Sequence, residues 1–229
     1  IDAADAAGAR RNIVVTGFGG EVVRAAIGDS VEYVEQREQL GTGHAVLQTK
    51  DLLAGEHGTI MVLCGDTPLL TAELLARFHE EHVNAGAKAT VLTAIMPNAK
   101  GYGRIVRRES GEVLKIVEHK DASPEEREIH EVNTGIYCFD AQALFSALAK
   151  VTNDNAQGEY YLPDVLSILR DAGEKIWAVV ADNYESTLGI NSRSQLAVAE
   201  RILRRRKVEE LMVDGVTIID PHTTFIDAE

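Results

Sequence analysis

The chain has 229 residues, of which 45% are hydrophobic and 26% are charged. These proportions are typical of an ordinary globular protein, and the length suits one large α/β domain, or one domain with a short appendage. The formal net charge of -13 disfavours nucleic acid and anionic membrane surfaces as partners. It also means that a nucleotide-binding enzyme of this composition would need a cation or a local basic cluster.

The two cysteines and the first residues suggest the state of the thiols, the compartment and the nature of the chain's start. Cys64 and Cys138 each sit in an apolar, strand-like run, which favours buried reduced thiols over a disulfide or a metal pair. No apolar run is long enough to span a bilayer, and the start has no apolar signal segment, so we expect a cytoplasmic protein. Residues 1–7 read as the last turns of a helix that Gly8 ends. Because the chain does not open with Met, we expect it to be a fragment.

In the first part of the chain, expected strands and helices alternate. The strands are expected at 12–16, 31–34, 59–63 and 89–95, and the helices between them at 21–27, 44–53 and 71–85. This order predicts an α/β fold with a mostly parallel sheet and helices on both faces.

After residue 95 the pattern changes to that of a mixed sheet extension. Segments 104–107 and 113–117 flank a Glu-Ser-Gly turn and predict a hairpin, and Ser123 followed by Glu126 predicts a short capped helix. The remaining elements are a strand at 132–139, a helix from Asp140 to Leu148, a helix at 163–170, a strand at 176–180 and one long helix at 192–211. The basic run at 204–207 is interpreted as a solvated helix face, with a subunit or domain contact as the alternative.

Few single motifs carry chemistry on their own. Asp66 directly follows an apolar strand, at the kind of strand end where open α/β sheets bind ligands. A carboxylate there suits Mg²⁺ on a phosphate chain, although capping of the next turn explains it equally well. His79 and His82 do not form a zinc motif and are interpreted as surface residues. The sequence contains no phosphate-binding P-loop and no evident nucleophile–base pair.

Read together, six segments are far more specific. They are QLGTGHA at 39–45, GDTPL at 65–69, GYGRI at 101–105, IVEHKDA at 116–122, NTG at 133–135 and NAQGEYY at 155–161. In this order the series resembles the N-terminal domain of the bacterial bifunctional N-acetylglucosamine-1-phosphate uridylyltransferases/glucosamine-1-phosphate acetyltransferases, over nearly the whole chain.

The resemblance implies a Rossmann-like nucleotide-diphospho-sugar transferase fold. It implies a uridylyltransferase domain at 1–191, a connecting helix at 192–211 and the start of a left-handed β-helix at 212–229. The family's first β-α unit, with the Gly-rich loop that cradles the triphosphate, is absent, so we expect this chain alone to be weakly active or inactive. The longer parent is expected to form a homotrimer through the β-helix and also to acetylate glucosamine 1-phosphate.

The reaction implied by the resemblance joins UTP and N-acetylglucosamine 1-phosphate to give UDP-N-acetylglucosamine and pyrophosphate, with Mg²⁺ as cofactor. Asp66 and Asn191 resemble the Mg²⁺ ligands of the catalytic centre. The residues that resemble substrate contacts are Gln36, Gly41 and Thr42 for uracil and ribose, Gly65, then Gly103, Glu118 and Asn133 for the amino sugar, with Glu159 and Tyr161 lining the sugar pocket.

Two alternatives stay open at this point. One is a uridylyltransferase for another hexose 1-phosphate, and the other is a non-catalytic domain that only binds a sugar nucleotide. A binding domain would have no need of both Asp66 and Asn191, so their joint presence favours the enzyme.

Overall fold

The computed structural model describes residues 1–155 and 157–227. The first elements are α1 (Asp2–Ala6), β1 (Ile13–Thr16), α2 (Gly20–Ile27), β2 (Glu32–Glu35), α3 (Thr42–Leu47), β3 (Thr59–Val62), α4 (Ala72–Ala85) and β4 (Ala89–Ile95). They are followed by β5 (Arg104–Arg107), β6 (Val113–Val117), α5 (Pro124–Arg127), β7 (Glu131–Asp140), α6 (Ala141–Leu148), α7 (Asp164–Asp171), β8 (Ile176–Val180), the 3-10 helix η1 (Tyr184–Thr187) and α8 (Arg193–Val213).

The strands and helices expected between residues 12 and 211 are present, and one of them is markedly shorter than predicted. The helix expected at 44–53 is α3, which ends at Leu47. The chain then tightens into turns, in which the Lys50 N–H donates to the Leu47 carbonyl three residues back. The predicted hairpin is confirmed as the antiparallel pair β5–β6. The capping box at Ser123 and Glu126 is also confirmed.

The sheet is mixed, as predicted, but it is not mostly parallel. The main sheet has six strands in the order β6-β5-β7-β4-β8, with β3 also paired to β7. Strand β7 runs antiparallel to β3, β4 and β5, while β4 and β8 run parallel. Strands β3 and β4, which follow each other in the sequence, are therefore separated by a strand that comes later in the chain. Strands β1 and β2 form a separate parallel pair.

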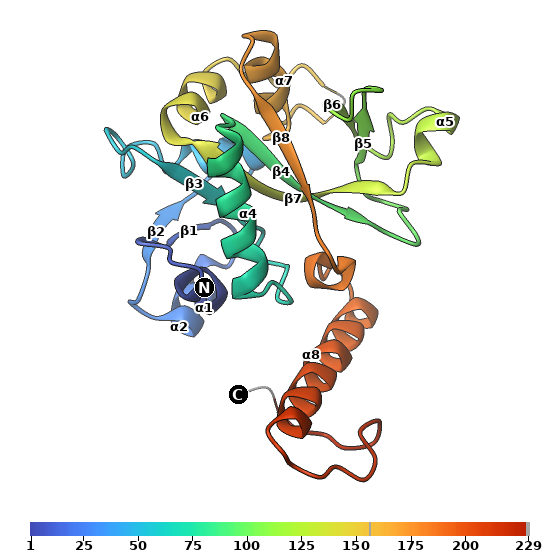
Figure 1. The fold of residues 1–229 in the computed structure, drawn as a ribbon. Coiled ribbons are helices and arrows are strands. Elements are labelled where there is room, and N and C mark those ends of the chain that lie inside the picture. The colour runs from blue at the N-terminus through green and yellow to red at the C-terminus, as the bar shows by residue number, and fades with distance from the viewer. Residues whose placement is uncertain (156, 228–229) are drawn as a thin grey trace.

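Helices cover both faces of the main sheet, as predicted (Figure 1). On one face, side chains of β4 and β7 such as Val91 and Phe139 pack with buried residues of α3, α6 and α7. On the other face, Leu92 and Ile136 pack against Phe78 of α4. The alternation of strand side chains between faces thus gives two cores on one sheet.

Two histidines that were predicted to lie at the surface differ in position. His79 is exposed, but His82 is only 3% exposed and its Nδ1 lies 2.7 Å from Thr90 Oγ1. His82 continues the buried helix face of Leu75 and Phe78, a helical spacing that outweighs its polarity. Burial lowers the pKa of His82. Both cysteines are free thiols; Cys138 is buried as expected, whereas Cys64 is only partly buried.

The long helix α8 leaves the main body below η1, as Figure 1 shows. Residues 214–227 form turns without a strand, so the start of a β-helix stays a prediction, as does the proposed domain division. Within residues 1–155 and 157–227, no helix combines the length and apolar character that a bilayer crossing requires.

Core packing of the main sheet gives a first test. Val91 in β4 is completely buried, whereas Val180 in the neighbouring β8 is 39% exposed. Val91→Ala is expected to lower the free energy of unfolding by about 2–3 kcal/mol, because it removes buried methyl groups and leaves a cavity. Val180→Ala is the matched control and is expected to cost less than about 1 kcal/mol. Urea denaturation measures both, and equal losses would contradict the assigned core.

Candidate functional site

The candidate site lies where one edge of β7 passes from its partner β3 to its partner β5. Tyr137 of β7 pairs with Val62 at the end of β3, and Val132 pairs with Arg104 at the start of β5. Between these pairs the register with β4 shifts, which marks a bulge in β7. The loops that follow β3 and precede β5 therefore meet over this bulge.

The predicted Asn-Thr-Gly motif builds the bulge. Gly135 has a φ of +79°, a left-handed conformation that favours glycine, and a Cβ there would lie 3.0 Å from Cys64 Sγ. The Thr134 hydroxyl donates to the Leu92 carbonyl at 2.7 Å, replacing a ladder bond that the bulge removes. Bulges re-aim side chains, and here the Asn133 side chain points towards the site, with its Oδ1 accepting from the Gly135 N–H.

Asp66 and Asn191 converge at the start of this site. A Cβ built on Gly189 would lie 3.2 Å from Asp66 Oδ2 and 3.8 Å from Asn191 Nδ2, so both side chains border the same small space. The Ile190 N–H donates to the Asp66 carbonyl at 2.9 Å, which ties the two segments together. Tyr102 lies beside them, and burial, with a smaller contribution from the Asp66 charge, raises the pKa of its hydroxyl. We call these residues the Asp66 group.

Gly103, Glu118 and Asn133 form a second cluster, the Glu118 group. A Cβ on Gly103 would lie 3.2 Å from Glu118 Oε1 and 3.6 Å from the Asn133 Cβ. The Asn133 N–H donates to the Gly103 carbonyl at 2.9 Å, and the Asn133 amide donates to the Tyr137 hydroxyl at 2.8 Å. Because Tyr102 and Gly103 are consecutive, the Glu118 group adjoins the Asp66 group.

The Glu118 carboxyl sits in an unfavourable place for a negative charge. Loss of solvent around the carboxyl raises its pKa, and the charges of Asp121 and Asp164 raise it further. The residue as a whole is nonetheless exposed, so the carboxyl is partly desolvated and still reachable. Burial also raises the pKa of Asp164. A carboxyl held in this way is a frequent feature of binding and catalytic sites.

The Gly41 loop, residues 40–43, is fastened to the segment 159–162. The Tyr160 N–H donates to the Leu40 carbonyl at 2.7 Å, and the Gly43 N–H donates to the Tyr160 carbonyl at 2.8 Å. Gly41 has a φ of +104°, and a Cβ there would come within 2.7 Å of the Tyr160 carbonyl oxygen. Only glycine fits this position, because both the conformation and the space exclude a side chain.

Two predicted nucleotide contacts are partly engaged within the protein. Gln36 is 9% exposed, and its amide nitrogen lies 3.0 Å from both the Gly41 carbonyl oxygen and His44 Nδ1. Its amide oxygen has no hydrogen-bond partner among the residues that the structure describes. The Thr42 hydroxyl accepts from the Leu162 N–H at 3.0 Å. Both residues thus shape the Gly41 loop, and their contacts to a nucleotide stay predictions.

The remaining predicted residues border the same region. Glu159 packs against Gly41, because a Cβ built on that glycine would lie 2.9 Å from the Glu159 Cβ. Burial first, and then the charges of Glu159 and Glu118, raise the pKa of the Tyr161 hydroxyl. A Cβ on Gly65 would meet nothing within 4 Å, so the backbone next to Asp66 is open to a ligand.

Helix α8 supplies supporting residues that sequence reasoning missed. Its N-cap Ser192 accepts from the Gln195 N–H, and Gln195 Oε1 accepts from the Asn191 N–H at 2.8 Å. Further along, Arg206 donates to the Leu69 carbonyl at 2.8 Å and to the Ser186 hydroxyl at 2.9 Å. One helix therefore holds both the Asn191 backbone and the loop that carries Asp66.

The basic run in α8 is accordingly not a purely solvated face, contrary to its interpretation from the sequence. Arg206 binds the main body, Arg205 pairs with Glu185, and the Arg204 guanidinium lies 4.7 Å from the Phe225 ring centre. The alternative of a contact between parts of the protein fits better. The Ser-x-x-Gln spacing at 192–195 is a helix-start pattern and was a usable signal for Gln195, whereas Arg206 had none.

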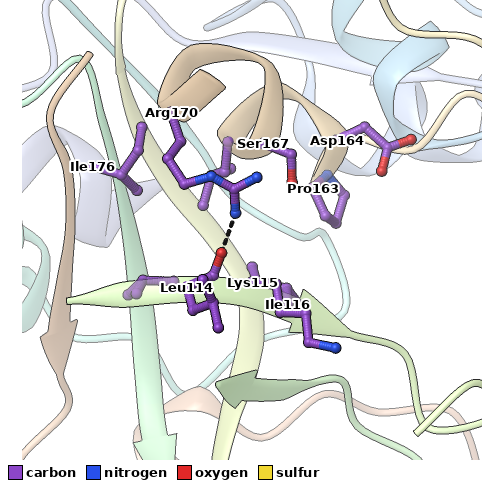
Figure 2. Close-up of a pocket in the computed structure, with 10 residues that line it drawn as sticks. Leu114, Lys115, Ile116, Pro163, Asp164, Ser167, Arg170 and Ile176 are labelled. Carbon is purple, nitrogen blue, oxygen red and sulfur yellow. Dashed lines mark hydrogen bonds between the residues drawn. The ribbon is translucent and has the colours of Figure 1, made fainter. Parts of the chain in front are cut away.

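A shallow hollow between β6 and α7 lies next to the Glu118 group. Figure 2 shows that Arg170 reaches from α7 to the Leu114 carbonyl of β6, with Ile116 and Asp164 at the other end of the hollow. Ile116 also contacts the position of Gly103, 3.4 Å from its built Cβ. The hollow thus lies behind Gly103, next to the candidate site, and none of the predicted substrate contacts lines it.

The raised pKa of Glu118 predicts a pH-dependent effect on stability. The folded protein holds this proton more tightly than the unfolded chain, so stability falls as the pH rises from the unfolded value of about 4.3 through the folded pKa. Glu118→Gln is therefore expected to stabilise the fold at neutral pH, with the gain vanishing as the pH falls towards about 4. Thermal unfolding across this range measures it, with Glu109→Gln in the exposed turn of the same hairpin as control. A pH-independent gain would contradict the assignment.

The attachment of α8 gives a second test. Arg206→Gln is expected to lower the free energy of unfolding by about 2–3 kcal/mol, because a charged donor loses two partly buried acceptors. Arg205→Gln removes surface ion pairs only and is expected to cost less than about 1 kcal/mol. Urea denaturation followed at α8 by a spectroscopic label separates local release of the helix from global unfolding. Equal effects of the two variants would refute the role of Arg206.

Known proteins resemble this chain in sequence and in fold. The chain is 53% identical to the "Bifunctional protein GlmU" of Oceanobacillus iheyensis over 95% of the chain, and 53% identical to that of Geobacillus thermodenitrificans over 100% of it. It spans about half the length of these relatives, 48% and 50%. The crystal structure of UDP-glucose pyrophosphorylase complexed with UDP-glucose has the same fold, with a TM-score of 0.63 over 86% of this chain and 82% of that one, at 16% identity. The family profile described as Nucleotidyl transferase matches residues 7–189, so the chain belongs to the nucleotidyl transferase family.

Proposed function

We propose that the chain forms most of a uridylyl-transfer domain that makes UDP-N-acetylglucosamine and pyrophosphate from UTP and N-acetylglucosamine 1-phosphate. One observation carries the proposal: Asp66 and Asn191, far apart in the chain, border the same space at Gly189. The family membership and the similarity to proteins named GlmU support it. Acetyl transfer, a β-helix that joins three subunits, and a cytoplasmic location belong to the proposal for the longer protein.

The donor set at Gly189 fits a hard divalent cation such as Mg²⁺. An exposed carboxylate and an exposed amide offer oxygen ligands, and the missing side chain of Gly189 leaves room between them. Mg²⁺ commonly binds through one or two protein oxygens and takes its other ligands from phosphate and water. The described residues contain no cluster of three or more acidic, His or Cys side chains suited to a metal.

The chemistry needs no general base from the protein. A sugar phosphate with a second pKa near ~6 is mostly dianionic at neutral pH, so its oxygen attacks the α-phosphorus of UTP directly. The new bond joins the sugar phosphate to the α-phosphorus, and the bond to the β-phosphate breaks to release pyrophosphate. A bound Mg²⁺ would neutralise charge on the phosphates. The protein's part is to align the two reactants in line.

The other groups of the site divide the recognition of the two substrates. Glu118 accepts hydrogen bonds from sugar hydroxyls, Asn133 both donates and accepts, and Gly103 lets the sugar approach the backbone closely. The open amide oxygen of Gln36 accepts from the uracil ring, and the Gly41 loop supports the ribose. Glu159 and Tyr161 line the sugar side of the pocket.

Removal of Asp66 tests the proposal in the intact protein. Asp66→Ala is expected to lower Mg²⁺-dependent pyrophosphate release by at least about a thousandfold, because the phosphates lose their cation. The fold should persist, since the exposed Asp66 side chain accepts no hydrogen bond from the described residues. Asp51→Ala, an exposed acid outside the site, is the matched control. Turnover of Asp66→Ala near that of the control would remove Asp66 from the mechanism.

The same assay distinguishes the alternatives. Product analysis with glucose 1-phosphate beside N-acetylglucosamine 1-phosphate separates the two sugar specificities. A domain that only binds sugar nucleotides would release no pyrophosphate with either sugar, while still binding UDP-N-acetylglucosamine in calorimetry.

A further inference from the structure

A second pocket lies away from the candidate site and has an unusual lining. It has a volume of about 240 Å³ and is open to solvent. Its walls come from the loop before β5, the end of β6 and the segment around α5. The lining residues are Pro97, Asn98, Ala99, Lys100, Arg104, His119, Arg127, Glu128 and His130. None of them is a predicted substrate or metal contact.

Two buried nitrogen atoms in this lining lack a hydrogen-bond partner. They are Arg104 Nε and His119 Nδ1, and no other buried side-chain nitrogen or oxygen of the described residues is left without one. Arg104 is only 2% exposed. Its two terminal nitrogens donate to the carbonyls of Tyr102 and Arg127, so the guanidinium is fixed while its Nε–H has no acceptor. A buried charged donor without an acceptor is costly, and such groups commonly mark a missing water or ion.

The charged residues of the lining also favour an ion as the ligand of this pocket. Lys100 and Arg127 form no ion pair with any carboxylate of the described residues, although the chain carries a net charge of -13. Two cations nearby in the chain do have partners: Arg107 binds Glu131 at 2.6 Å, and Lys115 binds Glu126 at 2.8 Å. Glu128 is the pocket's single acidic residue. Three cations, Lys100, Arg104 and Arg127, therefore line this cavity with only one carboxylate among them.

We propose that this pocket binds a phosphate group, either as free phosphate or pyrophosphate or as part of a small phosphate ester. A tetrahedral dianion accepts hydrogen bonds from several directions, which suits donors on three separate segments. The lining is mostly charged and polar and contains no Phe, Tyr or Trp, which favours a small phosphate compound over a nucleotide.

The pocket is separate from the candidate active site but adjoins it in the chain. Arg104 follows Gly103, and His119 follows Glu118. Successive residues of extended chain point to opposite faces, so Gly103 faces the Glu118 group while Arg104 turns to the other side. A phosphate bound here would brace the β5–β6 hairpin from behind, and the inference does not depend on the proposed reaction.

Calorimetry on the 229-residue chain tests the proposal with inorganic phosphate, pyrophosphate, a sugar 1-phosphate and sulfate as separate probes. Arg104 itself is left intact, because its guanidinium holds two carbonyls and its loss risks unfolding. Lys100→Gln and Arg127→Gln change exposed side chains instead, and each is expected to weaken phosphate binding about tenfold. Glu128→Gln removes the opposing charge and is expected to tighten binding severalfold. Lys150→Gln, an exposed lysine outside the pocket, is the matched control.

The outcomes separate this site from the candidate active site. Binding that Asp66→Ala leaves unchanged and that Lys100→Gln and Arg127→Gln weaken supports the proposal, as do phosphate-induced shifts of the His119 and His130 ring resonances. Stronger binding of the sugar phosphate than of free phosphate identifies an ester as ligand, and the reverse order identifies the free anion. No saturable binding, or binding that the three pocket variants leave unaltered, overturns the proposal.

Discussion

Strand β7 is the element on which the rest of the site depends, because it pairs along both edges and yet bends at Gly135. Strand β4 occupies one edge, while β3 and β5 share the other. Where β3 ends and β5 begins, the bulge interrupts the hydrogen-bond ladder along β7. Loops from three parts of the chain lie beside this interruption. A regular strand would have continued its ladder here and left no room for the Asn133 side chain to face the loops.

Backbone hydrogen bonds, more than side-chain contacts, bring the groups of the site together. The Gly41 loop is bonded to Tyr160, the Asp66 loop to Ile190, and Asn133 to Gly103. Glycines stand at close approaches between these segments, at positions 41, 103 and 189 among others. The relative positions of these backbone segments are thus set by the fold, and the acidic side chains of the site project from them. This explains how a chain with a large negative charge keeps Asp66, Glu118 and Asp164 within one region.

Much of the fold followed from local patterns. Apolar periodicity located the strands and helices, and the Glu-Ser-Gly turn located the β5–β6 hairpin. The sheet order did not follow, because β7 inserts between β3 and β4 from later in the chain, and nothing local records that pairing. His82 was misjudged because its polarity was weighed above its position on the buried face of α4.

The site was predicted through six motifs taken together, and the structure brings most of those residues into three adjoining groups. What the motifs omitted are the supports. Gln195 had a helix-start pattern that was available, but Arg206 acts on Leu69 across the molecule, and such a contact has no signature in a run of basic residues. The unpaired nitrogens of Arg104 and His119 are likewise visible only once burial is known.

The way α8 is attached has a consequence for the order in which the protein loses its structure. The helix buries only Ala199, Ile202 and Val208, so it contributes little to the two cores of the main sheet. Partial opening of the molecule is therefore expected to begin here, well before the sheet melts. Such an opening would free Asn191 from Gln195 and loosen the Asp66 loop, while β4 and β7 stay intact. Mild heating or dilute denaturant would then release α8 and loosen the site while the main sheet stays folded.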